Sequence, residues 1–458
     1  MTDSRSLTEL GRIIQSRSTT IAAWLGAAEI PQPSLSATYP WQEIDYPRDI
    51  EQDRAEILEA LDELRTLLLG PTSYLFHTSI TSVSYRALGR RLRMTHGHHE
   101  LTDRVQPVWV AVFTTLYRFQ IAQNVPRQGS ISYTDLAAQC DLGELDLRRV
   151  IRAAVSIRIF EEGDGHVRHN AISAALASPL SHDAVGFFAE EFHPAAMKFS
   201  EALRQFPGSK MAGESALALV NGLSGDMDIF SHVSKDPVRF ERFANAMSWM
   251  AMMPGTASSH FVNNVPWGRG EGQAVPACPR TIVDIGGSHG DLCKALLRGY
   301  PGIERAIVQD LPRVTQISLE ETFEAEYSNR IEYQAYDFFT EQPVKEADVY
   351  IFRTVLHDWP DSYAIKILRN QVPAMKPGAR ILINDICLES GQHTDPLTQQ
   401  AQCTHDMMVK MGVNAQERTT QEWANLLSEA NRGYKINSIV SPQSSVHSII
   451  EVVWEENP

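Results

Sequence analysis

Polar residues that can bind a ligand or move a proton follow four short apolar segments in the second half of the chain. The segments are 281–285, 306–309, 331–335 and 348–352, and each has the β-branched and aromatic composition of a buried strand. The polar residues at their ends are Asp284 with the glycines after it, Asp310, Asp337 with Phe338, and Arg353 with His357. In an open parallel sheet the carboxyl ends of the strands meet at one edge, where ligands bind. The spacing therefore predicts one shared cleft.

Residues 281–290 have the pattern of a strand, a glycine turn and the start of a helix. Gly286, Gly287 and Gly290 permit backbone dihedrals and a close approach to a ligand that a Cβ would block. By itself this pattern also fits an ordinary tight turn or a dinucleotide site. Asp310 then ends the next strand, about where a carboxylate meets ribose hydroxyls. With the carboxylate and the aromatic ring of 337–338, the pattern indicates a nucleotide-like ligand.

His357 follows the fourth apolar segment, at the mouth of the predicted cleft. Imidazole titrates near neutral pH, so it is suited to accept a proton from a reacting hydroxyl group. The same residue is also compatible with a purely structural role at the start of a helix near Pro360. The residues alone leave both interpretations open.

Composition limits the class of protein. A chain of 458 residues predicts two or three folding units, and 43% hydrophobic with 21% charged residues is typical of a globular protein with a large core. A net charge of −15 argues against nucleic acid as a partner, because phosphate binding needs Lys and Arg clusters. No run approaches the roughly 20 apolar residues that cross a bilayer, so we expect no membrane partner and a cytoplasmic location.

The cysteines favour neither a disulfide framework nor a zinc site. They are odd in number, scattered and without Cys-x-x-Cys spacing. We expect reduced thiols at Cys140, Cys278, Cys293, Cys387 and Cys403.

Four segments are predicted along the chain: a helical segment at 1–100, a winged-helix domain at 101–182, a helical connector with substrate-pocket residues at 183–262, and an α/β domain at 263–458. Leucines at three- and four-residue spacing in 57–69 predict an amphipathic helix whose apolar face needs a partner. Residues 133–140 and 145–155 predict two short helices, and 160–168 a glycine-containing turn between β-prone pieces, which is the pattern of a winged helix. Acidic neighbours dilute its arginines, so we expect no DNA binding.

Several of these segments carry motifs of a known family. The sequence resembles the class I S-adenosylmethionine-dependent O-methyltransferases of the plant caffeate and flavonoid type and their fungal secondary-metabolite relatives. The resemblance covers roughly residues 100–455 and rests on the segments 283–290, 309–312, 336–338, 353–361, 375–378 and 417–419. It implies a Rossmann-like cofactor-binding sheet domain, an N-terminal helical and winged-helix dimerisation domain, and a homodimer.

The resemblance also assigns roles to residues. It implies S-adenosylmethionine as the cofactor and His357 as the general base that deprotonates the acceptor hydroxyl, flanked by Asp385 and Glu417. Asp385 is one methylene shorter than the glutamate of the plant enzymes. The expected cofactor-binding residues are Asp284, Gly286, Gly287, Ser288, Gly290, Asp310, Leu311, Asp337, Phe338 and Arg353.

The acceptor is expected to be a hydroxyl, phenolic or enolic, of a flat small molecule whose identity the sequence does not reveal. Pocket residues are expected at His193, Met247, Met250, Met407, Met411 and Val413. No catalytic metal is expected, because the lone histidines lack paired ligand spacing. An alternative activity stays open: some fungal relatives keep the cofactor site but catalyse pericyclic or dehydrative rearrangements without methyl transfer, with the sulfonium as electrostatic help.

Overall fold

The computed structural model describes residues 5–33, 44, 46–81, 106–267, 277–320, 329–388 and 396–456. The chain divides into two compact units, Met1–Glu190 and Glu191–Pro458. Each unit is described by itself below. The finer boundaries expected at residues 100, 182 and 262 stay predictions.

A seven-stranded sheet forms the centre of the second unit. Its strands are β4 (Thr281–Ile285), β5 (Arg305–Asp310), β6 (Ile331–Ala335), β7 (Val349–Arg353), β8 (Arg380–Asn384), β11 (Tyr434–Val440) and β12 (Ile449–Trp454). The order is β11-β12-β8-β7-β4-β5-β6; the run from β8 to β6 is parallel, and β12 pairs antiparallel with both β8 and β11. The predicted α/β Rossmann-like class is confirmed, and the five parallel strands share one carboxyl edge.

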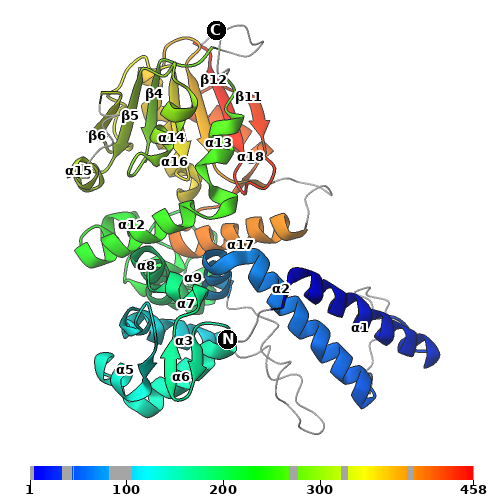
Figure 1. Ribbon diagram of the computed structural model, residues 1–458. Helices are drawn as coiled ribbons and strands as arrows, with labels where there is room; N and C mark the ends of the chain where they lie inside the picture. Colours follow the sequence, from blue (N-terminus) through cyan, green and yellow to red (C-terminus); the bar gives the residue numbers. More distant parts are fainter. Residues whose placement is uncertain are drawn as a thin grey trace. The chain divides into compact units, whose positions relative to one another are not determined.

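Alternation along the buried strands produces two apolar faces. Val283 and Ile285 pack with α16 (Asp361–Gln371) and α18 (Thr420–Ala430), whereas Ile282 packs with α13 (Ser258–Asn264) and α14 (Asp291–Gly299). Figure 1 shows these helices over the sheet. Because both faces are covered, the strands read as nearly continuous apolar runs in the sequence.

The remaining elements of this unit are helical or very short. They are α9 (His193–Gln205), α10 (Ala216–Val220), α11 (Ile229–Val233), α12 (Pro237–Ala251), α15 (Pro312–Glu320) and α17 (Pro396–Val413), the 3-10 turns Pro254–Thr256, Leu356–Asp358 and Val372–Ala374, and the parallel pair β9 (Cys387–Leu388) and β10 (Arg418–Thr419). Apolar side chains of α9, α10 and α11 form a core of their own, against which Val413 at the end of α17 packs.

The first unit contains the expected winged helix. The elements are α3 (Gln106–Arg118), α4 (Ile121–Asn124), β1 (Ile131–Ser132), α5 (Tyr133–Gln139), α6 (Glu144–Ser156), β2 (Glu161–Gly163), β3 (His166–Arg168), α7 (Ala171–Leu176), α8 (Pro179–Phe187) and the π-helix Phe188–Phe192. The wing is the hairpin β2–β3, whose turn residues Asp164 and Gly165 both have positive φ, 49° and 74°. Two such residues form the turn whose twist matches paired strands.

Two long helices precede the winged helix. They are α1 (Leu7–Ala27) and α2 (Arg48–Thr81), which pack against each other. The amphipathic pattern of 57–69 is helical as expected, and a break follows at Gly70, where φ is 72° and ψ is 169°, before Pro71. Glycine permits the positive φ, and proline cannot continue the hydrogen-bond ladder. Several leucines of these helices are exposed: Leu7, Leu58, Leu61, Leu67 and Leu68.

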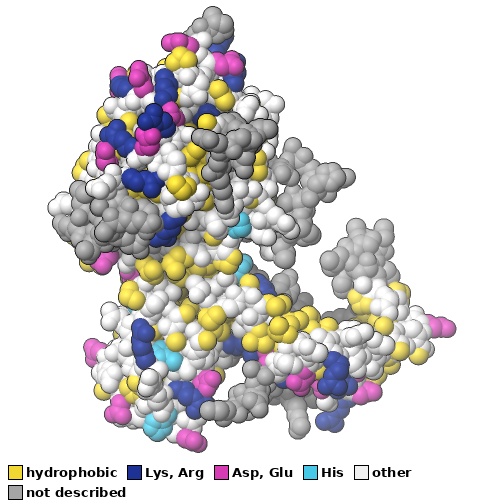
Figure 2. All heavy atoms as spheres, turned by 45° about the horizontal axis from the view of Figure 1, so that its top comes forward, with side chains coloured by type: hydrophobic (Ala, Val, Ile, Leu, Met, Phe, Trp, Pro, Cys, Tyr) yellow, Lys and Arg dark blue, Asp and Glu magenta, His cyan; other side chains and the backbone are white. Residues whose placement is uncertain are grey.

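The arginines of the winged helix pair with acids. Four ion pairs join Arg148 to Glu144, Arg149 to Asp146, Arg152 to Glu162 and Arg158 to Asp62. On the face drawn in Figure 2, basic and acidic side chains lie interspersed rather than in fields of one sign. Phosphate backbones bind to uncompensated positive charge, so this pairing disfavours a DNA surface here. In the described part of the chain, no helix has the length and apolarity needed to cross a membrane.

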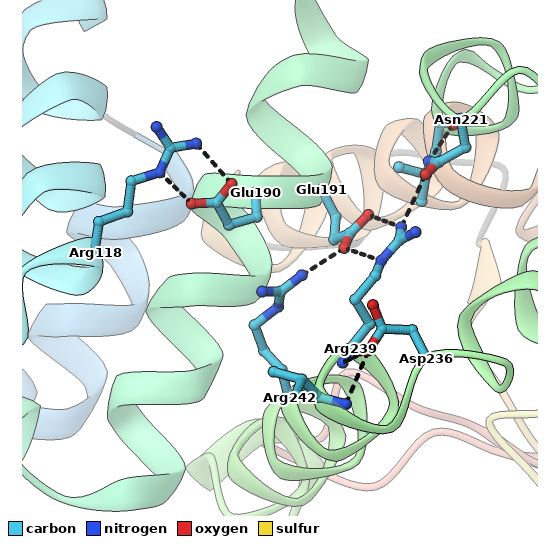
Figure 3. Close-up of polar contacts among 9 residues, drawn as sticks. Arg118, Glu190, Glu191, Asn221, Asp236, Arg239 and Arg242 are labelled. Atoms are coloured by element: carbon cyan, nitrogen blue, oxygen red, sulfur yellow. Dashed lines mark hydrogen bonds and ion pairs between the residues drawn. The ribbon is translucent and has the colours of Figure 1, made fainter.

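Two adjacent acids pair with arginines in different surroundings, as Figure 3 shows. Glu190 accepts two hydrogen bonds from Arg118, whose side chain is 60% exposed. The side chain of Glu191 is only 6% exposed and accepts hydrogen bonds from Arg239 at 3.0 and 2.6 Å and from Arg242 at 2.7 Å. Arg239 also donates to Asn221. Glu191 therefore ties α12 to the start of the second unit.

Candidate active site

The glycine turn connects β4 to α14 through a backbone that only small residues can follow. Gly286 and Gly290 have φ of 74° and 73°, and Ser288 between them also lies in the left-handed region at 48°. A Cβ on Gly290 would lie 2.6 Å from the Tyr333 hydroxyl oxygen, and one on Gly287 would lie 2.7 Å from a carboxylate oxygen of Asp284. The backbone amides at 286 and 287 both donate to the carbonyl of residue 309. At Gly287 and Gly290 the turn is thus packed too closely for a Cβ.

Asp310 at the end of β5 holds this turn from the other side. Its Oδ2 accepts a hydrogen bond from the Ser288 amide at 2.9 Å, and its Oδ1 accepts one from the Leu311 amide at 2.7 Å. Burial raises the pKa of Asp310, and these two hydrogen bonds oppose that shift. Each carboxylate oxygen keeps acceptor capacity, which a ligand hydroxyl can use.

Asp337 and Phe338 follow β6 at the same edge of the sheet. Asp337 is exposed, and its Oδ1 accepts a hydrogen bond from the Phe339 amide at 2.9 Å. The ring of Phe338 is partly buried and lies edge-on to Trp359, with 5.8 Å between the ring centroids. A carboxylate and an aromatic ring therefore stand beside each other at the end of the third parallel strand.

Asp284 and Arg353 are neighbouring charges on β4 and β7. Asp284 is 2% exposed, and its burial raises its pKa to about 7, although the charge of Arg353 acts to lower it. The guanidinium of Arg353 donates to the carbonyl oxygen of Thr256. Arg353 is therefore already tied to the segment between α12 and α13.

His357 lies in the 3-10 turn that follows β7, and Glu417 lies just before β10. Nδ1 of His357 is 2.8 Å from Oε1 of Glu417, and both side chains are buried, with 5% and 0% of their surface exposed. The two residues are distant in sequence, so this contact is made by the fold. It is the acid–imidazole arrangement that orients a base and stabilises its charged form.

Asp385 lies next to His357 and contacts its backbone. Its Oδ2 accepts a hydrogen bond from the backbone amide of His357 at 3.1 Å, whereas the imidazole bonds Glu417. Asp385 follows β8 directly, and its fully buried carboxyl holds the backbone of the turn that carries the imidazole.

The charges around His357 decide its protonation. Burial lowers its pKa, but the nearby charges of Glu417, Asp358 and Asp385 outweigh burial and raise the pKa to about 10. The same contacts hold the pKa of Glu417 well below its usual range despite burial. Burial raises the pKa of Asp385 to about 6. The pair therefore stabilises imidazolium next to a carboxylate.

Arg418 fixes the turn that carries His357. Its side chain is fully buried, donates to the carbonyl oxygens of Leu356 at 3.1 Å and Trp359 at 2.8 Å, and also bonds Asp361 at the start of α16. The two carbonyl groups belong to residues on either side of the imidazole. Arg418 thus clamps this turn, while the preceding residue, Glu417, supplies the carboxylate.

A second histidine, His405 on α17, was not predicted as a site residue. Its Nδ1 lies 2.7 Å from the same Oε1 of Glu417, and its ring stacks on that of His357 with 5.4 Å between centroids and 12° between planes. Its side chain is 33% exposed. The sequence carries no signal for it, because no spacing links His405 to Glu417 and none of the family motifs includes it.

The expected pocket residues lie on three helices. Met247 and Met250 belong to α12, Met407 and Met411 to α17, and His193 begins α9. Val413, at the end of α17, lines a small recess together with Phe230, Asp358 and Trp359. Val413 therefore lies beside the turn that carries His357, whereas Met407 is 43% exposed. The roles of all six residues stay predictions.

Known proteins resemble this chain over its whole length. An O-methyltransferase domain family matches residues 277–435. The chain is 30% identical to "O-methyltransferase kk1A" of Curvularia clavata, over 98% of this chain and 97% of that protein, and 31% identical to the "Chlorophenol O-methyltransferase" of Trichoderma longibrachiatum, over 99% and 91%. The solved structure of LepI in complex with SAM superposes with a TM-score of 0.63 at 23% identity, over 97% of this chain and 100% of that one.

Proposed function

We propose, for a chain that belongs to the S-adenosylmethionine-dependent O-methyltransferase family and to its fungal secondary-metabolite branch, that His357 is the general base of methyl transfer to a hydroxyl. The observation that carries this proposal is the buried contact of 2.8 Å between Nδ1 of His357 and Oε1 of Glu417. That contact leaves Nε2 as the ring nitrogen that can meet an acceptor.

The strand ends fit the cofactor. We propose that Asp310 and Leu311 hold the ribose, Asp337 and Phe338 the adenine, and Asp284, Gly286, Gly287, Ser288, Gly290 and Arg353 the methionine end. The remaining acceptor capacity of the Asp310 carboxylate and the close packing at the glycines of the turn support this assignment. S-adenosylmethionine supplies a methyl group that is already activated on a sulfonium. The protein therefore has to position the acceptor and remove one proton.

Proton removal is carried out by His357, in the turn after β7, together with Glu417, just before β10. Nε2 of His357 accepts the proton of the acceptor hydroxyl from the neutral form of the ring, which is the minor form at neutral pH because the pKa is raised to about 10. The oxygen that loses this proton becomes the nucleophile. Glu417 accepts the hydrogen bond of Nδ1–H and stabilises the imidazolium that forms. Asp385 and Arg418 hold the backbone of the turn and so keep the imidazole in place. Neither of these two side chains is proposed to contact the acceptor.

We propose a phenolic or enolic acceptor on a flat small molecule. One relative over nearly the whole chain is named for chlorophenol methylation, which supports a phenol. Partly buried methionines on α12 and α17 suit an adaptable apolar pocket for a planar ring. The pocket residues proposed are His193, Met247, Met250, Met407, Met411 and Val413.

The fate of the cofactor tests this function. Purified protein is incubated with methyl-labelled S-adenosylmethionine and a panel of phenols, enols and pyridone alcohols. We expect label in the product and one S-adenosylhomocysteine per product molecule. Product formed while the cofactor stays intact would instead identify a pericyclic or dehydrative rearrangement, and methyl transfer would be rejected.

The base is tested by substitution. We expect His357→Ala to lower the rate of methyl transfer by about 10²- to 10⁴-fold, because general-base catalysis contributes that much. Calorimetry should show that the variant still binds the cofactor. The matched control is His166→Ala, since His166 is an exposed histidine of the wing. An equal rate in His357→Ala and the control would remove His357 from this role.

We also propose a homodimer formed through the N-terminal helices and the winged helix. Five leucines of α1 and α2 are 38–67% exposed, which supports a contact with a second copy. The cytoplasm is the proposed location, supported by five cysteines that are all free in the structure. Nucleic acid and membranes are not proposed as partners.

A further inference from the structure

Three side chains near the base have the chemistry of a metal site. His357, His405 and Glu417 each offer one ligand atom, and these atoms all lie within 4.8 Å of one another. Two imidazoles and one carboxylate, with the fourth position open, form a ligand set found in protein zinc sites. The residues come from the turn after β7, from α17 and from the segment before β10, so only the fold brings them together.

The three ligand atoms already lie close enough for local side-chain movement to bring them around one ion. Both Nδ1 atoms lie 2.7–2.8 Å from the same Oε1 atom. Ligand atoms about 2.0–2.1 Å from one tetrahedral zinc ion lie roughly 3.3 Å apart, so each of these two N–O pairs must separate by roughly half an ångström. The two stacked rings must also turn so that their nitrogens face one ion. The partial exposure of His405 provides a route from solvent, because its side chain is 33% exposed while the other two are buried.

A buried oxygen atom points independently to a missing ligand. Oε2 of Glu417 has no hydrogen-bond partner among the described residues, although the side chain is fully buried. An unpaired carboxylate oxygen is costly in such a place. Both hydrogen bonds to Glu417 go to its other oxygen, Oε1. A cation bound by the carboxylate would compensate its negative charge more completely than these two hydrogen bonds do.

A carboxylate, that of Asp358, lies near the second ring nitrogen of His357, beyond hydrogen-bond distance. Its Oδ1 lies 3.6 Å from Nε2 of His357, on the side of the ring away from Glu417. A metal-ligating histidine commonly donates its second N–H to a carboxylate, which fixes the tautomer.

We propose that His357, His405 and Glu417 bind one divalent transition-metal ion of the zinc class, which reversibly inhibits the enzyme. A metal on Nδ1 leaves the single ring proton of His357 on Nε2, the nitrogen that must accept the acceptor's proton. The ion also takes up the Glu417 carboxylate that stabilises imidazolium. The inhibition rests on the proposed role of His357, whereas the metal site itself does not.

Binding is measured first on the full-length protein, with Zn²⁺ in competition with a chromophoric chelator and with Co²⁺ as a spectroscopic probe. We expect one equivalent of metal per chain and the visible bands of low-coordinate cobalt. His405→Phe, which keeps a stacked ring but removes the ligand, should weaken zinc binding by at least about 100-fold. His405→Cys, which supplies another zinc ligand, should retain it.

Controls exclude binding elsewhere. Cys403 is an exposed thiol on the same helix, so Cys403→Ser should leave zinc affinity unchanged. His166→Ala should do the same. Thermal unfolding and cofactor binding show whether each variant is folded. Zinc affinity that survives His405→Phe, or that disappears in Cys403→Ser, would overturn the site.

Inhibition is measured second, as methyl transfer against free zinc concentration. We expect loss of activity in parallel with occupancy, recovery on adding chelator, and a matching loss of sensitivity in His405→Phe. Binding at these residues without inhibition would overturn the regulatory part. Absence of zinc binding in a protein that methylates normally would overturn the metal site and leave the proposed function intact. Zinc binding at these residues in a protein that transfers no methyl group would support the metal site and overturn the proposed function.

Discussion

At the scale of single residues, one carboxylate organises the chemistry. Glu417 carries both imidazoles on a single oxygen, and the His357 contact was expected from the resemblance of 353–361 and 417–419 to family motifs. His405 was missed because its contact with Glu417 depends on how α17 packs, which no local spacing reports. Asp385 was expected to flank the base with a side chain one methylene shorter than the glutamate of the plant enzymes, and it bonds the backbone amide of His357.

Asp284 gives a prediction about pH and stability. Its pKa in the folded protein is about 7, above the roughly 3.9 of an unfolded chain, so the folded state binds more protons between about pH 4 and 7. The contribution of Asp284 to the free energy of unfolding therefore falls as pH rises through that range. Urea unfolding without cofactor should show that Asp284→Asn gains roughly 3 kcal/mol relative to the wild type between pH 5 and pH 8. A difference that stays constant with pH would mean that the buried carboxyl titrates normally.

At the scale of elements, the sheet was the most predictable part. The apolar runs at 281–285 and 306–309 became β4 and β5, because strands covered on both faces need continuous apolar residues. The segment 331–335 became the edge strand β6, which is only partly buried. The helices were less predictable. The pattern at 57–69 gave the amphipathic face but not the full extent of α2, which continues past the break at Gly70.

The two acids of Figure 3 give a prediction about helix anchoring. Glu191→Gln removes the buried charge that joins Arg239 and Arg242, and we expect a loss of about 3–5 kcal/mol in the free energy of unfolding, since one partner of a buried ion pair is removed. Glu190→Gln is the matched control, because its partner Arg118 is largely exposed and such pairs contribute about 0–1 kcal/mol. Chemical unfolding followed by circular dichroism compares the two. Equal losses would show that burial of the Glu191 pairs has no energetic weight.

At the scale of the whole molecule, the proposed dimer rests on an apolar surface. The leucine pattern predicted a helix face in need of a partner, and Leu58 and Leu68 are still 45% and 67% exposed after the unit has folded. Local periodicity identifies such a face, but it does not say which molecule covers it.

Substitution of these leucines tests the dimer. We expect the wild type to have the mass of two chains in light scattering, and Leu58→Glu with Leu68→Glu to shift it toward one chain, because charges replace apolar contact area. Val238→Glu, on an equally exposed valine of α12, is the control and should leave the mass unchanged. A double variant that keeps the mass of two chains would place the contact elsewhere.

The clamp made by Arg418 has a consequence for how such enzymes diversify. It anchors the proton-accepting turn to α16 and to the strand β10, and none of these contacts involves the methionines of α12 or α17. The proposed pocket residues of α12 can therefore change without loosening this anchor, whereas α17 is coupled to the proposed base through His405, which bonds Glu417. On the proposed function, new acceptors would be recruited at lower risk by changes on α12 than by changes on α17.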